Sequence, residues 1–303
     1  CSSDLEGYAK STGRIGVAVV TSGPGATNAI TGIADAMGDS VPLLVFSGQV
    51  ATPGIGKDAF QEADIIGITT PITKYNYQIR HTEDIPRIIT EAIHIATTGR
   101  PGPVVIDVPK DVQEKIIEAY NDPTIHLPSY QPTIEPNGMQ VKKILKQLSQ
   151  SKRPVLLTGG GVNYADATKE LVAFAERYQL PVVSTLLGLG TIPIHHELSL
   201  GMGGMHGSYA SNMALTEADF ILNIGARFDD RLTGRVNSFA VNTTVAHIDV
   251  DPVGVPGQGF EHIGHNRKRG AYGSVRVHKR LFVFLQIAVV GKGQAFHNGQ
   301  QGV

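Results

Sequence analysis

The residues best suited to chemistry form a glycine-rich stretch near the start of the chain, Thr21-Ser22-Gly23-Pro24-Gly25-Ala26-Thr27-Asn28. An apolar run at residues 17–20 precedes it, and apolar residues at helical spacing follow it. Two glycines around a proline let the backbone approach a ligand or another subunit closely, and Thr27 and Asn28 offer polar groups to the free N–H groups of a helix start. The stretch therefore favours a polar or anionic cofactor. An ordinary strand-to-helix turn with a capped helix also explains it, and no Gly-x-Gly-x-x-Gly dinucleotide motif follows the strand.

Elements that position this stretch are visible in the first 120 residues. Apolar runs at residues 17–20, 41–46 and 104–108 predict buried strands, and the helices between them predict a parallel sheet covered on both faces. A helix is expected to begin at Thr82, as its cap, and to end before Gly99. Residues 49–61 read as a long loop at the carboxyl end of a strand, where such sheets bind ligands.

A second α/β pattern follows a proline-rich linker at residues 121–137. Further strands are predicted at residues 154–157, 181–184, 220–224 and 245–250, with helices between them, including one striped by apolar residues that follows the triplet Gly159-Gly160-Gly161. These units predict a compact domain of nucleotide-binding type. The domains are therefore placed at residues 1–120 and 138–253, with an atypical basic tail at 254–303.

Composition limits the classes of function. A chain of 303 residues is long enough for two domains, and its net charge of −1 gives no reason to expect nucleic acid or a membrane surface as a partner. The single cysteine, Cys1, excludes an intrachain disulfide and favours a reducing, cytoplasmic location. No apolar run of about 18 residues predicts a membrane span, and no secretory leader is visible.

The stretch at residues 21–28 also carries a resemblance, which extends over roughly residues 5–252. The chain is similar to the acetolactate synthase family of thiamine-diphosphate enzymes. Other stretches that carry this resemblance are Asp39-Ser40-Val41-Pro42, Gly48-Gln49-Val50, Lys57-Asp58-Ala59-Phe60-Gln61-Glu62, Ile72-Thr73-Lys74-Tyr75-Asn76-Tyr77, Gly99-Arg100-Pro101-Gly102-Pro103-Val104, Val108-Pro109-Lys110-Asp111, Gly203-Gly204-Met205-His206-Gly207 and Arg227-Phe228-Asp229-Asp230-Arg231. The resemblance implies an α/β fold in which a partial pyrimidine-binding domain with a parallel sheet is followed by a Rossmann-like, FAD-binding central domain.

In the first domain, the resemblance implies a site for thiamine diphosphate. Pro24 and Asn28 are expected beside the aminopyrimidine, and Gln61 is expected to face the reacting centre, where an amide can hydrogen-bond a carboxylate or carbonyl. Phe60 would line the substrate channel, although its residue type equally suits packing under a loop. Lys110 could steer a carboxylate substrate, although a lone lysine is more often a solvated surface charge.

In the second domain, the resemblance implies an FAD site. The expected contacts are Arg100, reaching across from the first domain, and Gly159, Gly160, Gly161, His206, Gly207, Gly225, Arg227 and Asp249. A guanidinium suits a diphosphate, but a domain-boundary ion pair explains Arg100 equally well, and an aspartate at a strand end is commonly a turn former. FAD in this family performs no net redox step. Metal binding at His195 and His196 is not expected, because adjacent residues point in different directions and no third ligand stands at zinc spacing.

Family resemblance further implies decarboxylation of pyruvate and ligation to a second pyruvate or to 2-oxobutanoate, in branched-chain amino-acid synthesis. A homodimer or tetramer and a small regulatory subunit are the implied partners. The activating glutamate is expected just ahead of Cys1, and the Mg²⁺ site is expected in a third domain. The chain alone is therefore expected to be an inactive fragment. Its tail, residues 254–303, is expected to be the product of a frameshift. Two alternatives stay open, namely a flavoenzyme of the pyruvate oxidase type and a non-catalytic nucleotide-binding module.

Overall fold

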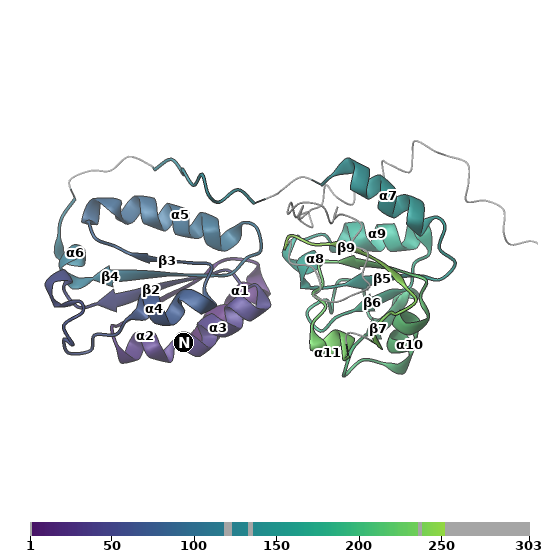
Figure 1. Cartoon of the computed structure of the whole chain (residues 1–303), viewed down its shortest axis with the longest axis horizontal. Helices are drawn as coiled ribbons and strands as arrows, with labels where there is room; N and C mark the ends of the chain where they lie inside the picture. Colours follow the sequence, from purple (N-terminus) through teal and green to yellow (C-terminus); the bar gives the residue numbers. More distant parts are fainter. Residues whose placement is uncertain (1, 118–122, 133–135, 236–237, 252–303) are drawn as a thin grey trace, which may run out of the picture. The chain divides into compact units, whose positions relative to one another are not determined.

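A computed structural model describes residues 2–117, 123–132, 136–235 and 238–251 of the chain (Figure 1). The chain divides into two compact units, Cys1–Pro132 and Thr133–Val303. The boundary falls inside the linker that the prolines predict. The tail predicted to be atypical, 254–303, lies outside the described residues.

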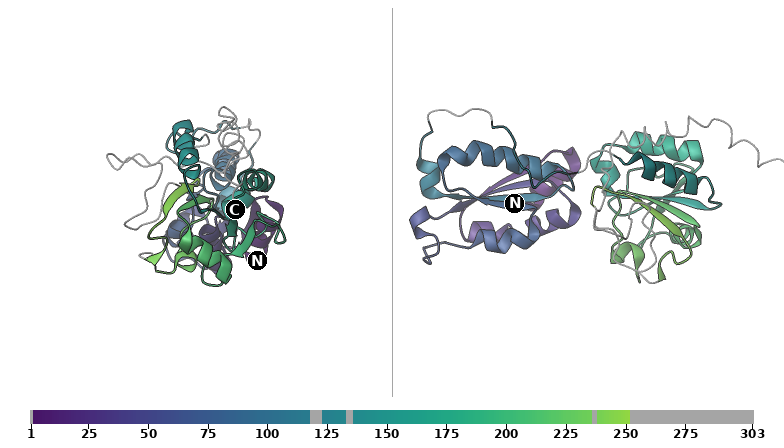
Figure 2. Two further views of the ribbon diagram at one scale, coloured as in Figure 1. Left: turned by 90° about the vertical axis from the view of Figure 1, so that its right-hand side faces the viewer. Right: turned by 45° about the horizontal axis from the view of Figure 1, so that its top comes forward.

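A four-stranded parallel sheet forms the centre of the first unit, with strand order β1-β2-β4-β3. Its strands are β1 (Gly16–Val20), β2 (Leu43–Gln49), β3 (Tyr75–Gln78) and β4 (Pro103–Pro109). The helices are α1 (Ser2–Thr12), α2 (Pro24–Asn28), α3 (Ile30–Asp39), α4 (Ile65–Thr69), α5 (Ile85–Thr97) and α6 (Lys110–Glu114). Helix α5 covers one face of the sheet and α3 lies against the other, a layering visible from a second direction in Figure 2.

A five-stranded parallel sheet forms the centre of the second unit, with strand order β7-β6-β5-β8-β9. Its strands are β5 (Pro154–Thr158), β6 (Val182–Ser184), β7 (Ser199–Met202), β8 (Phe220–Ile224) and β9 (Thr244–Ile248). The helices are α7 (Gly138–Leu148), α8 (Gly160–Tyr164), α9 (Thr168–Tyr178), α10 (Tyr209–Glu217) and α11 (Asp230–Thr233). Helices α7 and α9 pack on one face, and α10 and α11 pack on the other.

The strands predicted from apolar runs are confirmed, as is the α/β class, but the predicted burial of residues 17–20 is wrong: β1 is an edge strand in which Val17 and Val19 are exposed. Two strands were not predicted, and both lie at sheet edges. Strand β3 has no fully buried residue and β7 contains a glycine and is only partly buried, so neither shows the apolar run that marks a central strand. The single helix predicted after Gly161 is two helices, α8 and α9.

Two predicted helix caps are wrong. The hydroxyl of Thr82 donates to the carbonyl of Val112 at 2.9 Å, so it ties the start of α5 to α6 instead of capping the helix. Thr27 lies inside α2, where its hydroxyl donates to the carbonyl of Pro24 at 3.3 Å. Each threonine hydroxyl donates to a backbone carbonyl, and this hydrogen bond takes the place of a helix cap.

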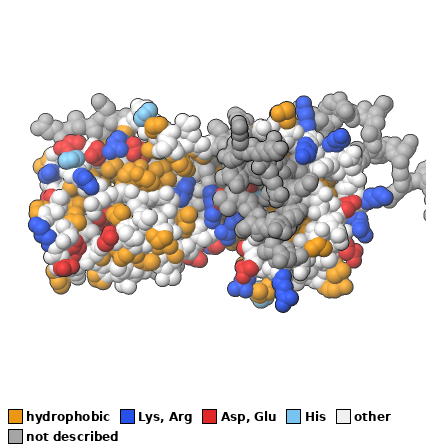
Figure 3. Space-filling view, in the orientation of Figure 1, with side chains coloured by type: hydrophobic (Ala, Val, Ile, Leu, Met, Phe, Trp, Pro, Cys, Tyr) orange, Lys and Arg blue, Asp and Glu red, His pale blue; other side chains and the backbone are white. Residues whose placement is uncertain are grey.

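Charged side chains are interspersed on the face of the first unit that Figure 3 shows, with apolar side chains between them. Within the described part of the chain, no helix has the length and apolar character needed to cross a membrane.

Lys74 fastens the predicted linker to the first unit. Its ammonium group donates to the carbonyl of Ile95, to that of Thr98 at 2.7 Å and to the hydroxyl of Tyr130 at 3.0 Å. It therefore binds the carboxyl end of α5 and a residue of the linker at once. Burial, and after it the charge of Arg100, lower the pKa of Lys74 to about 8.

The pH dependence of stability should report this residue. The pKa of Lys74 is lower in the folded chain than its ordinary value of 10.5, so the unfolded chain binds more protons between these two values. Stability contributed by Lys74 is full above that window and is lost as the pH falls through about 8. As the pH rises from about 7 to about 10, the free energy of unfolding in urea should increase by about 2 kcal/mol more for the wild type than for Lys74→Met. Lys143→Met, which replaces an exposed lysine, is the control and should keep the pH dependence of the wild type. If the stability of Lys74→Met followed the same pH dependence as that of the wild type, the lowered pKa of Lys74 would be contradicted.

Candidate functional site

The loops that follow β1 and β2 meet at the carboxyl edge of the first sheet. Parallel strands place their carboxyl ends at one edge, and strands β1 and β2 are direct neighbours. Gly23 has a φ of 59°, and a Cβ atom built there would lie 2.7 Å from the carbonyl oxygen of Gln61. Glycine is therefore required at this position, both for the backbone conformation and for the approach of the second loop.

This contact places Gln61 beside the start of α2, the helix that carries Pro24 and Asn28. Pro24 follows Gly23 directly, and Asn28 lies one helical turn later on the same face of α2. All three are exposed. Within the described ranges, the side-chain amides of Asn28 and Gln61 have no hydrogen-bond partner, so both can bind a ligand. Their predicted contact with a cofactor remains a prediction.

Glu62 organises the loop that carries Phe60 and Gln61. Its carboxylate accepts N–H groups from Gly56, from Lys57 at 3.3 Å and from Ala59 at 2.9 Å. These hydrogen bonds, with that of Gly56 the strongest, lower the pKa of Glu62. The side chain of Phe60 is consequently presented outward and is 88% exposed. Glu62 is named in the sequence analysis only as part of a longer motif. A carboxylate that binds the backbone of its own loop leaves no periodic pattern in the sequence by which it could be predicted.

Arg100 and Lys110 have partners inside their own unit. The Arg100 guanidinium donates to the hydroxyl of Ser40 at 2.8 Å and to the carbonyl of Met37 at 3.1 Å, at the end of α3. Lys110 is exposed and pairs with Glu114 across one turn of α6 at 3.7 Å. These Arg100 contacts are hydrogen bonds to the end of a helix within the first unit, and the predicted FAD contact of Arg100 remains a prediction.

Three glycines interlock at the carboxyl edge of the second sheet. The N–H of Gly161 donates to the carbonyl of Gly225 at 3.0 Å, and the N–H of Gly225 donates to Ile248 at 2.8 Å. A Cβ atom at Gly159 would lie 2.2 Å from the Gly225 oxygen, and one at Gly161 would lie 2.7 Å from the Gly225 Cα. Gly159 and Gly161 therefore serve backbone packing between the ends of β5 and β8. Gly160 meets only the side chains of Leu187 and Tyr164 and one more distant carbonyl, so it has the most room of the triplet.

The remaining residues of the predicted FAD site follow strands of this same parallel sheet. Arg227 is exposed two residues beyond Gly225, and in the described part of the chain its side chain has no hydrogen bond or ion pair. Asn223, fully buried, holds this turn because its amide donates to the carbonyl of Ala226 at 2.7 Å. Sequence reasoning missed Asn223, which lies inside an apolar run.

His206, Gly207 and Asp249 lie after β7 and β9. His206 is exposed, and a Cβ at Gly207 would lie 2.5 Å from the Met202 carbonyl oxygen, so that glycine also serves local packing. The Asp249 carboxylate accepts the N–H of Asp251 at 2.9 Å, as a turn former does. The structure thus places these residues beyond the carboxyl ends of parallel strands, and flavin contacts remain predictions.

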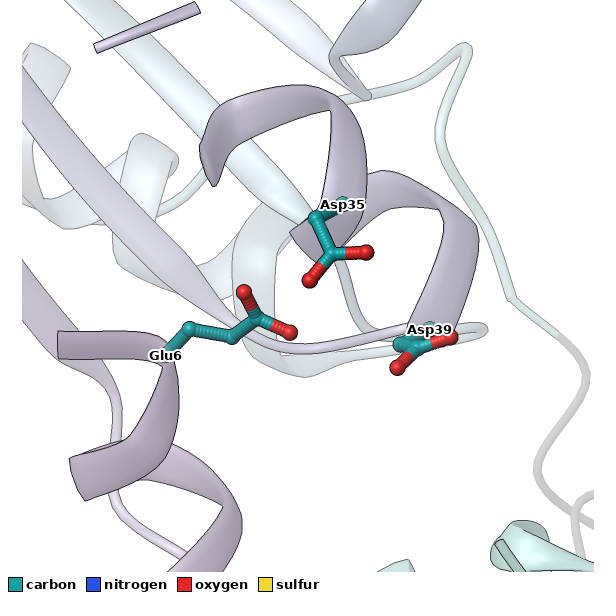
Figure 4. A group of neighbouring side chains, drawn as sticks. All are labelled: Glu6, Asp35 and Asp39. Carbon is teal, nitrogen blue, oxygen red and sulfur yellow. The ribbon is translucent and has the colours of Figure 1, made fainter. Parts of the chain in front are cut away.

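One acidic cluster in the described ranges has the spacing of metal ligands, namely Glu6 of α1 with Asp35 and Asp39 of α3 (Figure 4). The ammonium group of Lys10 lies 2.6 Å from Glu6 and 2.7 Å from Asp39. Burial raises the pKa of Glu6, Lys10 opposes that shift, and Asp35 adds to it. Lys10 already supplies the cation that this cluster needs, so the cluster is a link between α1 and α3. The ring of His196, one of the two adjacent histidines considered above, lies 3.2 Å from the carboxylate of Glu176.

Comparison with known proteins gives two family matches, one in each unit. The thiamine pyrophosphate enzyme N-terminal TPP binding domain matches residues 6–68, and the thiamine pyrophosphate enzyme central domain matches residues 141–262. The second match extends past Pro252, where the resemblance seen in the sequence was expected to stop. Both units are therefore domains of one enzyme family, in the order that the sequence predicts.

Curated relatives share much of the sequence. The acetolactate synthase large subunit of Lactococcus lactis is 63% identical over 248 residues, which is 82% of this chain and 43% of the relative. The large subunit of Corynebacterium glutamicum is 52% identical over 246 residues, covering 81% of the chain and 39% of the relative. A probable large subunit of Methanocaldococcus jannaschii is 51% identical over 250 residues, covering 82% and 42%. The chain spans about two fifths of the length of these relatives. The chain therefore belongs to the thiamine pyrophosphate enzymes, and its sequence is similar to acetolactate synthase large subunits.

Proposed function

We propose that this chain forms the pyrimidine-binding and central parts of a thiamine-diphosphate-dependent acetolactate synthase. The reaction releases carbon dioxide from one pyruvate and joins the remaining two-carbon unit to a second 2-oxo acid, pyruvate or 2-oxobutanoate, at the entry to branched-chain amino-acid synthesis. The observation that carries the proposal is the 63% identity to an acetolactate synthase large subunit over 248 residues, which spans both units.

The edge formed by α2 and loop 50–63 fits thiamine diphosphate. Asn28 and Gln61 are exposed amides without a protein partner among the described residues, and an amide both donates and accepts, as a substituted pyrimidine requires. Pro24 offers an apolar contact on the same face of α2. When bound, thiamine diphosphate supplies the electron sink that decarboxylation needs.

Residues of the chain itself would handle the substrate. The Gln61 amide can hydrogen-bond the carboxylate or carbonyl of a 2-oxo acid without changing its protonation state. Phe60, which is 88% exposed, would exclude water from the channel, and the exposed Lys110 would attract the substrate carboxylate.

The carboxyl edge of the second sheet fits FAD in part. Arg227 is exposed and free of partners in the described ranges, and its planar donor fork suits a diphosphate. We assign His206, Gly207 and Gly160 to flavin contacts, and Asp249 to a ribose or adenine group, on the same resemblance. Arg100 is assigned to FAD by the resemblance alone.

The remaining assignments also come from the family. Mg²⁺ would be held outside this chain, in a third domain. The proposed assembly is a homodimer or tetramer with a small regulatory subunit, in the cytoplasm.

A chimera tests this function. The matched segment of the Lactococcus lactis large subunit is replaced by that of this chain, and acetolactate formation from pyruvate is measured with and without thiamine diphosphate. The proposal expects turnover that requires the cofactor. Bleaching of a bound flavin by pyruvate, without acetolactate, would instead support a pyruvate oxidase. Flavin binding with no turnover, while the parent enzyme is active, would support a non-catalytic module.

A further inference from the structure

Two acids, Asp107 of β4 and Asp111 of α6, accept hydrogen bonds from residues at or beside the start of the loop that carries Phe60 and Gln61. We propose that Asp107 and Asp111 are positioning residues for loop 50–63. The consequence for catalysis rests on the function proposed above, whereas the effect on the loop does not.

Asp107 lies under the loop, in the middle of the first sheet. Its side chain is fully buried, and its register partners are Ser47 on β2 and Gln78 on β3. One carboxylate oxygen, Oδ2, accepts the amide N–H groups of Gln49 at 3.2 Å and Gln78 at 3.0 Å. Burial raises the pKa of Asp107, and these two amide donors oppose the shift. Burying a carboxylate costs free energy, and the two amide hydrogen bonds offset part of that cost.

Gln49 joins the two ends of the loop. Its side-chain oxygen accepts the N–H of Val50 at 2.8 Å, and its Nε2 donates to the carbonyl of Ala63 at 3.1 Å. The same Nε2 donates to Asp107. Asp107 therefore fixes the orientation of the one amide that bridges the first residue and the last residue of loop 50–63.

Asp111 holds the loop from the outside. Its Oδ1 accepts both the N–H of Thr52 at 2.9 Å and the Thr52 hydroxyl at 3.0 Å. The Thr52 N–H, the largest influence, lowers the pKa of Asp111. Lys110, between the two acids, points to solvent and pairs with Glu114. The Val108–Asp111 motif therefore contacts the loop through Asp111, not through its lysine.

Trypsin measures the loop directly, because Lys57 is exposed within it. Cleavage of the chain after Lys57 tracks how often the loop opens. Asp111→Ala removes two hydrogen bonds to a carboxylate and should raise this cleavage rate on the order of tenfold, without lowering the urea midpoint in proportion. Gln49→Leu removes the bridge between the loop ends and should raise it similarly. Glu114→Ala, an exposed acid on the same helix, is the matched control and should leave the rate unchanged.

Conservative variants separate positioning from general destabilisation. Asp111→Asn keeps an oxygen for Thr52, and Asp107→Asn keeps one oxygen for both glutamine amides, so both should retain slow cleavage. Asp107→Ala keeps no acceptor and should lose the protection. Unchanged cleavage in Asp111→Ala and Gln49→Leu, or cleavage that rises only as far as global stability falls, would overturn the proposal. If the variants changed the cleavage rate as expected but the chimera were inactive, the positioning role of Asp107 and Asp111 would be supported and the proposed function would be rejected.

Discussion

Replacing Gln61 by alanine in the chimeric enzyme is expected to lower kcat/KM for pyruvate roughly 100-fold, the usual loss when one positioned hydrogen-bond donor is removed from a reacting centre. The backbone of Gln61 is fixed by Gly23, with a Cβ there only 2.7 Å from its oxygen, so the amide projects from a held loop. Since the side chain has no protein partner in the described ranges, the substitution should leave folding intact.

Steady-state kinetics and urea unfolding check this result together. Lys57→Ala, which changes another exposed side chain of the same loop, serves as the control and should keep kcat/KM within about twofold. If Gln61→Ala retained full kcat/KM with a folded protein, Gln61 would not face the reacting centre. A rise in KM with kcat unchanged would mean that the amide only binds substrate.

Replacing Gly159 by alanine is expected to destabilise the second unit by about 3 kcal/mol or more, since the added methyl group meets backbone and cannot be relieved by a rotamer change. The new Cβ would lie 2.2 Å from the Gly225 oxygen and 2.4 Å from the Ala226 Cα. Its φ of −125° is accessible to any residue, so the loss comes from the contact and not from backbone strain.

Gly160 provides the matched control for this substitution. A Cβ there would lie 3.2 Å from the Leu187 Cβ, so Leu187 would have to move by only a few tenths of an ångström, and Gly160 begins helix α8. Gly160→Ala should therefore change the free energy of unfolding by less than about 1 kcal/mol. Equal urea midpoints for Gly159→Ala and Gly160→Ala would show that β5 and β8 do not approach each other as described.

Much of the fold could be predicted from the sequence, because its central strands are continuous apolar runs. The run at 220–224 became β8, and that at 104–108 became most of β4. Edge strand β3 could not be found this way, since Tyr75 is exposed and the strand alternates weakly. Thr82 precedes two acidic residues, as a helix cap often does, but its hydroxyl donates to the carbonyl of Val112, which is distant in sequence. A contact of this kind has no local sequence signal.

The candidate site shows the same division. Glycines at strand ends were expected to admit a ligand, but Gly159 and Gly161 face Gly225 of their own chain. A sequence cannot distinguish these two reasons for a glycine, because both require a missing side chain. Asp107 could not be predicted, because one acid inside an apolar strand forms no spacing pattern. Its hydrogen bond to Gln49 nevertheless connects it to loop 50–63.

A crystal structure of the chimera with thiamine diphosphate would show whether α2 and loop 50–63 bind the cofactor. We expect the aminopyrimidine to contact the Pro24 ring and to lie within hydrogen-bond distance of Asn28, with the Gln61 amide directed at the reactive carbon. An aminopyrimidine bound away from α2 and loop 50–63 would contradict this expectation.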